Sequence, residues 1–277
     1  MVLSAAFIVP HGALILDASP SHTDGRYELH QAMIYIANQI SKMNPDLVLV
    51  TSPHGISLSD DFGIYLNDSA HGTAEWEGEY QEYKIDVDID FEFAEELFKH
   101  LEANQHPISK ITAFSRGVSI PLRWGESVPL WFLKDIQESK YVFLSQPQKR
   151  YDPSINFMVE TSKLGENIFQ FIDMSKKRVV VLISADLAHT HHEEGPYGFY
   201  EDADTVDQFL EDWMRSPNSS TDTSDSYSLI KKALCCGYTG FLLLQGILKD
   251  IEMEVEILSR QTPTYYGMMV ASFLPKT

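Results

Sequence analysis

Three of the ten histidines in this chain come just after segments that the sequence predicts to be buried strands. They are His11 after Leu3–Val9, His54 after Asp46–Thr51 and His189 after Arg178–Ser184. Because the carboxyl ends of strands line the ligand crevice of an open α/β sheet, we expect these imidazoles to converge. His11 and His54 share the sequence Pro-His-Gly, in which proline fixes the strand exit and glycine permits a close turn. Neutral imidazole is a ligand for iron and zinc, so the pair predicts a two-histidine metal site; the alternative is turn histidines without a role.

A third metal ligand is available in the late segment ALCCGYTGFLLLQGIL, residues 233–248. Cys235 and Cys236 are the only cysteines, and they directly precede a predicted helix, where the positive end of the helix dipole favours a thiolate. The pattern does not distinguish between the two cysteines. A buried cysteine with no role in chemistry is an equally common occurrence.

The densest polar cluster in the chain is SADLAHTHHEEGPYG, residues 184–198, which contains His189. A histidine at a strand end inside a cleft is suited to proton transfer, so we expect His189 to be a general acid or base. His191 and His192 are predicted to be solvated loop residues. No H-E-x-x-H, G-x-S-x-G, P-loop or G-x-G-x-x-G sequence occurs, which leaves a zinc protease, a serine hydrolase and a nucleotide cofactor unsupported.

The elements that position these residues are predicted from short apolar runs, which alternate along the chain with segments of helical periodicity. Several of the runs are rich in Val, Ile and Leu without alternation, which is typical of strands covered on both faces. Together they predict a single three-layer α/β/α domain, residues 1–277, with a central parallel or mixed sheet. Lys84–Asp90 alternates strictly and is predicted to be a half-exposed edge strand, and residues 216–226 are predicted to be a mobile surface loop. The further predicted strands are Gly63–Leu66, Tyr141–Ser145, Met253–Leu258 and Met268–Phe273, and the predicted helices are Glu28–Met43, Phe91–Ala103, Glu160–Phe171, Thr205–Met214 and Gly240–Lys249.

The composition narrows the range of partners. The 277 residues carry a formal net charge of −19 at pH 7, which argues against nucleic acid and against anionic membrane surfaces. Two adjacent cysteines cannot form a disulfide framework, and the apolar N-terminus lacks the basic residues of a signal peptide, so a cytoplasmic location is expected. No apolar stretch is long enough to predict a membrane span.

Four segments, in order, resemble the LigB-type superfamily, which includes class III extradiol ring-cleavage dioxygenases and Memo-like proteins. They are VPHGALIL, TSPHGISLSDDFGIYL, ISADLAH and CCGYTG…PTYYGMMVASF, and the resemblance extends from about residue 3 to 274. It implies a three-layer α/β domain, His11 and His54 as metal ligands, and His189 as the acid/base. It also implies a small catechol-like substrate, non-haem Fe(II) as the metal with Zn(II) as the alternative, and, by analogy with many relatives, a homo-oligomer.

Two departures from the superfamily pattern affect the expected activity. The ring-cleaving enzymes carry a late glutamate ligand, whereas Cys236 stands in that part of this sequence, as in the Memo-like branch. In RWGESVPLWFL, Arg123 and Trp124 replace an Asp-His pair, so Trp124 either fills the cleft or stacks on an aromatic ligand. Tyr265 and Tyr266, with Tyr266 the preferred candidate, are expected to hydrogen-bond a phenolic substrate; the alternative is packing beside the terminal strand. Three hypotheses remain: an extradiol-type dioxygenase, a Memo-like metal- or peptide-binding protein without ring cleavage, and a zinc hydrolase.

Overall fold

The computed structural model describes residues 2–136, 138–149, 155–217 and 227–276. Its main sheet has eight strands in the order β10-β11-β1-β9-β2-β8-β3-β6, in which the central neighbours β1, β9, β2 and β8 run parallel. The strands at the β10 end and the β3–β8 pair are antiparallel, so the sheet is mixed. The strands are β1 (Leu3–Val9), β2 (Leu47–Ser52), β3 (Phe62–Tyr65), β6 (Ile108–Ile111), β8 (Lys140–Ser145), β9 (Val179–Ser184), β10 (Met253–Gln261) and β11 (Met268–Pro275).

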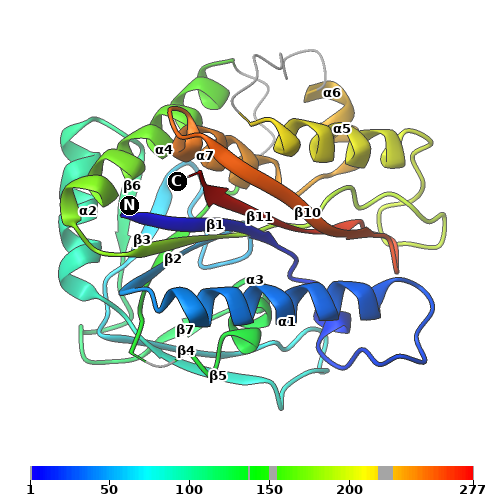
Figure 1. The fold of residues 1–277 in the computed structure, drawn as a ribbon, viewed down its shortest axis with the longest axis horizontal. Helices are drawn as coiled ribbons and strands as arrows, with labels where there is room; N and C mark the ends of the chain where they lie inside the picture. The colour runs from blue at the N-terminus through cyan, green and yellow to red at the C-terminus, as the bar shows by residue number, and fades with distance from the viewer. Residues whose placement is uncertain (1, 137, 150–154, 218–226, 277) are drawn as a thin grey trace.

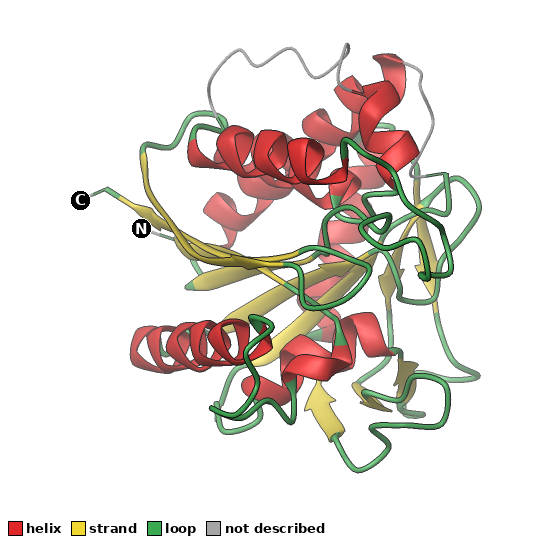
Figure 2. Ribbon diagram, turned by 90° about the vertical axis from the view of Figure 1, so that its right-hand side faces the viewer, coloured by secondary structure: helices red, strands yellow, loops and turns green. Residues whose placement is uncertain are grey.

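Helices cover both faces of this sheet (Figure 1). Seen edge-on, the sheet lies between an upper and a lower helical layer (Figure 2). The helices are α1 (Arg26–Met43), α2 (Phe91–Ala103), α3 (Trp124–Phe132), α4 (Ile155–Ser175), α5 (Ala203–Arg215), α6 (Tyr227–Ala233) and α7 (Tyr238–Leu248). Within the described residues, no helix is both long and apolar enough to cross a membrane.

Strand β1 shows why both faces need a cover. Its Leu3 and Ile8 side chains join a buried core that includes residues of α2, α4, α5 and α7. Its Phe7 and Val9 side chains join a second core with residues of α1 and α3. Because successive strand residues point to opposite faces, the unbroken apolar run of β1 needs both cores. The expected α/β fold with three layers is therefore confirmed.

A second, three-stranded sheet lies beside α3, in the order β5-β4-β7. Its strands are β4 (Ser69–Thr73), β5 (Lys84–Asp88) and β7 (Ile120–Leu122). β5 occupies an edge and exposes alternate residues, as the alternation of Lys84–Asp90 predicts. The loop expected at 216–226 lies outside the described residues from 218 onward.

Candidate metal centre and cleft

Polar side chains follow three parallel strands at the carboxyl edge of the sheet. β1 ends at Val9, β2 at Ser52 and β9 at Ser184. Because β9 pairs in parallel with both β1 and β2, these three ends lie side by side. Two residues beyond each end come His11, His54 and Asp186, respectively. The rings of His11 and His54 are 4.8 Å apart between centroids, at 83° to each other. Convergence of His11 and His54 therefore follows from the sheet order.

Ser184 fixes the tautomer of His11. The Ser184 hydroxyl donates to the carbonyl of Gly125, so it must accept the hydrogen of His11 Nδ1, which lies 2.9 Å from its Oγ. The lone pair of His11 then resides on Nε2, which faces the site. His11 is 2% exposed, so this hydrogen bond lies in the protein interior.

Cys236 completes a group of donor atoms. Its Sγ lies 3.5 Å from His11 Nε2. One ligand atom from each of His11, His54 and Cys236 falls within 4.8 Å of the other two. Cys235 is fully buried, and burial raises the pKa of its thiol well above the ordinary range. Cys236 is therefore the cysteine that the geometry offers as a ligand, and two imidazoles with a thiol form a donor set suited to iron or zinc.

Asp186 is a site residue that the sequence reasoning missed. Its Oδ2 lies 3.1 Å from His11 Nε2, and its Oδ1 accepts the backbone N–H of His11 at 3.1 Å. Burial raises the pKa of Asp186 to about 8, with the neighbouring charge of Asp207 adding to the effect. A neutral carboxyl that donates its proton to Nε2 satisfies both the contact and the raised pKa. The sequence could have indicated Asp186, because it lies two residues beyond the end of its strand, as His11 and His54 do.

Buried hydrogen bonds position the loop that carries His54. The Tyr65 hydroxyl accepts the backbone N–H of Ile56 at 2.6 Å and hydrogen-bonds Glu126. Glu126 also accepts the backbone N–H of Arg123 at 2.9 Å, which caps α3. Burial raises the pKa of Glu126 to about 7. These contacts tie the His54 loop to the first turn of α3.

Trp124 stacks on His54, with the ring centroids 5.0 Å apart and an interplanar angle of 26°. Trp76, from the connection between β4 and β5, packs edge-on against Trp124 at 4.7 Å. Trp124 thus forms one wall of the cleft beside a candidate ligand. Sequence reasoning found Trp124 but gave no indication of Trp76.

His189 lies on the opposite side of the cleft. Its Nδ1 donates to the carbonyl of Leu187 at 2.9 Å, so in the neutral ring Nε2 is the basic nitrogen. Tyr266 stacks on His189 at 5.4 Å, and burial raises the pKa of Tyr266 well above its ordinary value.

The loop around His189 is held from behind by Asp207, which is fully buried on α5. Asp207 accepts the backbone N–H of Ala188 at 2.8 Å and contacts Nε2 of His191 at 2.9 Å. The His191 side chain is only 10% exposed, so the prediction of a solvated residue is wrong for this position. His192 is exposed, as expected.

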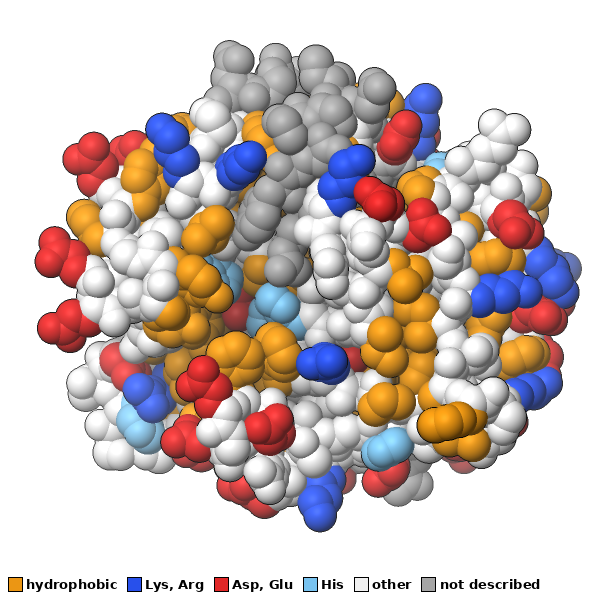
Figure 3. Space-filling view, turned by 180° about the vertical axis from the view of Figure 1, so that it is seen from behind, with side chains coloured by type: hydrophobic (Ala, Val, Ile, Leu, Met, Phe, Trp, Pro, Cys, Tyr) orange, Lys and Arg blue, Asp and Glu red, His pale blue; other side chains and the backbone are white. Residues whose placement is uncertain are grey.

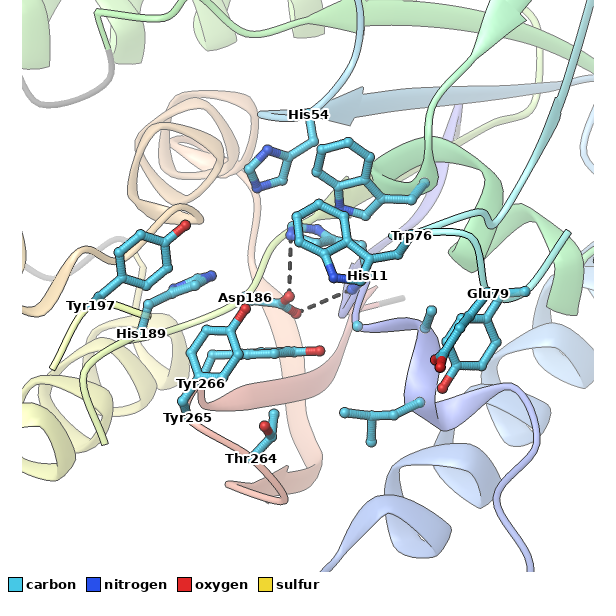
Figure 4. A pocket seen from close by; sticks show the side chains of 15 residues that line it. His11, His54, Trp76, Glu79, Asp186, His189, Tyr197, Thr264, Tyr265 and Tyr266 are labelled. Carbon is cyan, nitrogen blue, oxygen red and sulfur yellow. Dashed lines mark hydrogen bonds and ion pairs between the residues drawn. The ribbon is translucent and has the colours of Figure 1, made fainter. Parts of the chain in front are cut away.

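His11, His54, Asp186 and His189 line one open cleft with a volume of about 210 Å³. In Figure 4 the labelled histidines, Asp186 and the tyrosines surround a common space, with Trp76 across from Tyr266. From outside, histidine side chains are visible in a hollow edged by hydrophobic side chains (Figure 3). Six of the lining residues are tryptophan or tyrosine: Trp76, Tyr80, Trp124, Tyr197, Tyr265 and Tyr266.

Comparisons with known proteins agree with this fold. A crystal structure of protein JW3007 from Escherichia coli K12 superimposes with a TM-score of 0.55 at 12% identity, covering 97% of this chain and 99% of that one. Protein CA_C1420 of Clostridium acetobutylicum is 22% identical over 290 residues, which cover 97% of this chain and 57% of the relative. The chain thus spans little more than half the length of that curated relative. Residues 5–271 match the family described as the catalytic LigB subunit of aromatic ring-opening dioxygenase, and the chain belongs to this LigB family.

Proposed function

We propose that the protein is a metal-dependent extradiol-type dioxygenase that opens the ring of a small catechol-like substrate. One observation carries the proposal: three metal-donor atoms lie together, and two of the residues that carry them, His11 and His54, line an aromatic-walled cleft that His189 also lines. Membership of the LigB family supports a dioxygenase-like chemistry. The same resemblance leads us to propose one domain over residues 1–277, assembled into a homo-oligomer.

Two imidazoles and a thiol are suited to binding a divalent metal, and the proposed activity requires Fe(II). His11, His54 and Cys236 would hold it, because Ser184 directs the His11 lone pair toward Sγ of Cys236. When bound, Fe(II) would supply a Lewis acid for the catechol oxygens and an electron donor for dioxygen. Binding would displace the proton that Asp186 shares with His11 Nε2, so metal affinity should rise with pH.

The protein side chains supply orientation and proton transfer. Trp124 and Tyr266 both line the cleft, and their rings would offer surfaces against which a flat substrate would stack. His189 Nε2 would remove a proton from one catechol hydroxyl and later return it, because Nδ1 is occupied by the Leu187 carbonyl. The hydroxyl of Tyr266 would donate to a substrate oxygen, since its raised pKa keeps it protonated.

A Memo-like protein that binds metal or peptide without ring cleavage is the second candidate. Two observations favour it: the thiol of Cys236 in place of a carboxylate, and the indole of Trp124 stacked on His54. Thiolate is a softer ligand than carboxylate and favours zinc over Fe(II). With zinc bound, the same three ligands would leave a coordination position for water, which is the arrangement of a zinc hydrolase.

Oxygen uptake separates these candidates. The protein is reconstituted with Fe(II) under argon and mixed with catechol, dihydrocaffeate and related compounds in air-saturated buffer. Ring opening predicts stoichiometric oxygen consumption and a new product chromophore. His189→Gln should lower the rate by roughly 100-fold or more, since a general acid/base contributes about that factor. His192→Gln, a change at an exposed neighbouring histidine, is the matched control. Full metal loading without oxygen uptake for any catechol would refute the dioxygenase.

A further inference from the structure

Asp207 is a carboxylate on α5 to which the proposed reaction assigns no role. It is fully buried, and both of its oxygens are engaged. Oδ1 accepts the backbone N–H of Ala188 at 2.8 Å, and Oδ2 accepts from Nε2 of His191 at 2.9 Å. Ala188 and His191 lie on either side of His189 in the sequence. The carboxylate therefore holds the chain both before and after the candidate acid/base.

The peptide unit between Leu187 and Ala188 links Asp207 to the ring of His189. Its N–H donates to Asp207, while its carbonyl, which belongs to Leu187, accepts the hydrogen of His189 Nδ1 at 2.9 Å. A peptide unit is planar and trans, so its N–H and its carbonyl point in opposite directions and turn together. A carboxylate that fixes the N–H therefore also fixes the carbonyl. That carbonyl keeps the ring hydrogen on Nδ1 and the lone pair on Nε2.

Neighbouring backbone holds the carboxylate of Asp207 in place. The N–H of His191 donates to the Tyr265 carbonyl at 3.1 Å, which anchors the residue whose ring binds Oδ2. Gly267 lies so close that a Cβ at this position would be 2.1 Å from Oδ2, and only glycine permits this approach. These contacts leave the carboxylate little room to rotate.

We propose that Asp207 is a positioning residue for His189 and acts through the peptide unit between Leu187 and Ala188. The carboxylate fixes the peptide, and the peptide holds the imidazole in one tautomer and one orientation. His191, the second histidine of the A-H-T-H sequence, orients the carboxylate and transfers no proton itself. The consequence for turnover rests on the proposed function, whereas the tautomer of His189 does not depend on it.

The tautomer of His189 is measured by ¹⁵N NMR on histidine-labelled protein loaded with Zn(II). The ring signals of His189 are identified by their absence in His189→Gln. Asp207→Ala removes both contacts of the carboxylate. Asp207→Asn keeps an oxygen that can accept the N–H of Ala188, and it is the conservative replacement.

Asp90 offers a matched control, because it is also a buried aspartate with two partners. Its Oδ1 accepts the backbone N–H of Phe93 at 3.2 Å, and its other oxygen pairs with Lys177. Its own N–H donates to the carbonyl of Tyr141 near the start of β8, at the edge of the sheet opposite the cleft. Asp90→Ala should therefore lower stability without affecting His189.

The wild type and Asp90→Ala should show His189 with its hydrogen on Nδ1 alone. Asp207→Ala should show a mixture of both tautomers, and Asp207→Asn should restore the single one. With a catechol, the kcat of Asp207→Ala should fall by up to about 100-fold with little change in KM, since a misplaced catalytic group costs about that factor.

A single Nδ1 tautomer in Asp207→Ala would overturn the inference, and so would tautomer mixing in Asp90→Ala or Asp207→Asn as large as in Asp207→Ala. If Asp207→Ala does not fold, His191→Ala takes its place, because it removes one of the two partners of the carboxylate. It should show partial mixing, and an unchanged tautomer would equally overturn the inference. The NMR measurement needs no substrate, so the expected tautomers without oxygen uptake for any catechol would refute ring opening alone.

Discussion

Replacing Ser184 with alanine tests how the protein prepares His11 for a metal. The Ser184 hydroxyl accepts from His11 Nδ1 and donates to the Gly125 carbonyl, and it is fully buried. Ser184→Ala removes both contacts without changing the backbone. His11 is then free to place its proton on Nε2, the atom that faces Cys236.

The two lost hydrogen bonds determine how much stability and metal affinity Ser184→Ala should lose. Two buried polar groups lose their partner, each at about 1–3 kcal/mol, so unfolding free energy should fall by about 3 kcal/mol. For a chain of this size the midpoint should drop by roughly 6–12 °C. Loss of a hydrogen bond that orients a metal-binding histidine should also weaken metal affinity by about 10–100-fold.

The assay measures thermal unfolding and a competitive Zn(II) titration against a chromophoric chelator. Ser139→Ala is the matched control, because Ser139 is also buried and donates to the Pro45 carbonyl at 2.7 Å, before β2 and away from the cleft. The control should lose about 1–2 kcal/mol of stability with unchanged metal affinity. Metal affinity of Ser184→Ala within twofold of the wild type would refute the role assigned to Ser184.

Three further predictions concern the surrounding structure. Burial raises the pKa of Glu126 from 4.5 to about 7, so the folded state binds the Glu126 proton more tightly than the unfolded state does. The unfolding free energy of the wild type should therefore fall by up to ~3 kcal/mol as the pH rises between these two values. Urea unfolding from about pH 5 to about pH 8 should show a smaller dependence on pH for Glu126→Gln, and an unchanged dependence would contradict the raised pKa. Gly246→Ala would place a Cβ against the Ser162 carbonyl where α4 and α7 meet and should cost about 2–3 kcal/mol in chemical unfolding, whereas Gly117→Ala meets no atom within 4 Å and should be neutral. Gly12→Ala would place a Cβ 2.6 Å from the Tyr266 hydroxyl, so the tyrosine side chain would have to move. This displacement should weaken dihydrocaffeate binding several-fold with little change in melting temperature. Unaltered affinity would show that Tyr266 does not contact the ligand.

Much of the fold was predictable because the central strands are continuously apolar. β1 has the predicted bounds, and β2, β8 and β9 differ from the predicted ranges by a residue at one or both ends. Three strands were not predicted: β4, β6 and β7 have only five, four and three residues and contain polar residues, glycine or proline. α3 was also missed, since Pro129 lies inside it and almost every residue is buried, which removes the helical periodicity.

The candidate site was predictable where one strand end carried one distinctive residue. His11 and His54 follow from the strand-end rule and lie together in the structure. Asp186 obeys the same rule, but aspartates are abundant in this acidic chain, and His189 drew attention in its place. The distinction between Cys235 and Cys236 depends on the backbone direction at the start of α7, which no local pattern encodes. Trp76 reaches the cleft through a long-range contact with Trp124.

The central claim is that His11, His54 and Cys236 form a metal site. Cobalt(II) substitution tests it most directly, because a thiolate ligand gives cobalt an intense near-ultraviolet charge-transfer absorption. The account predicts one cobalt ion per chain with this absorption in the wild type and in Cys235→Ala, and its loss in Cys236→Ser. Retention of the band in Cys236→Ser, or a fully cobalt-loaded wild type without it, would contradict the account.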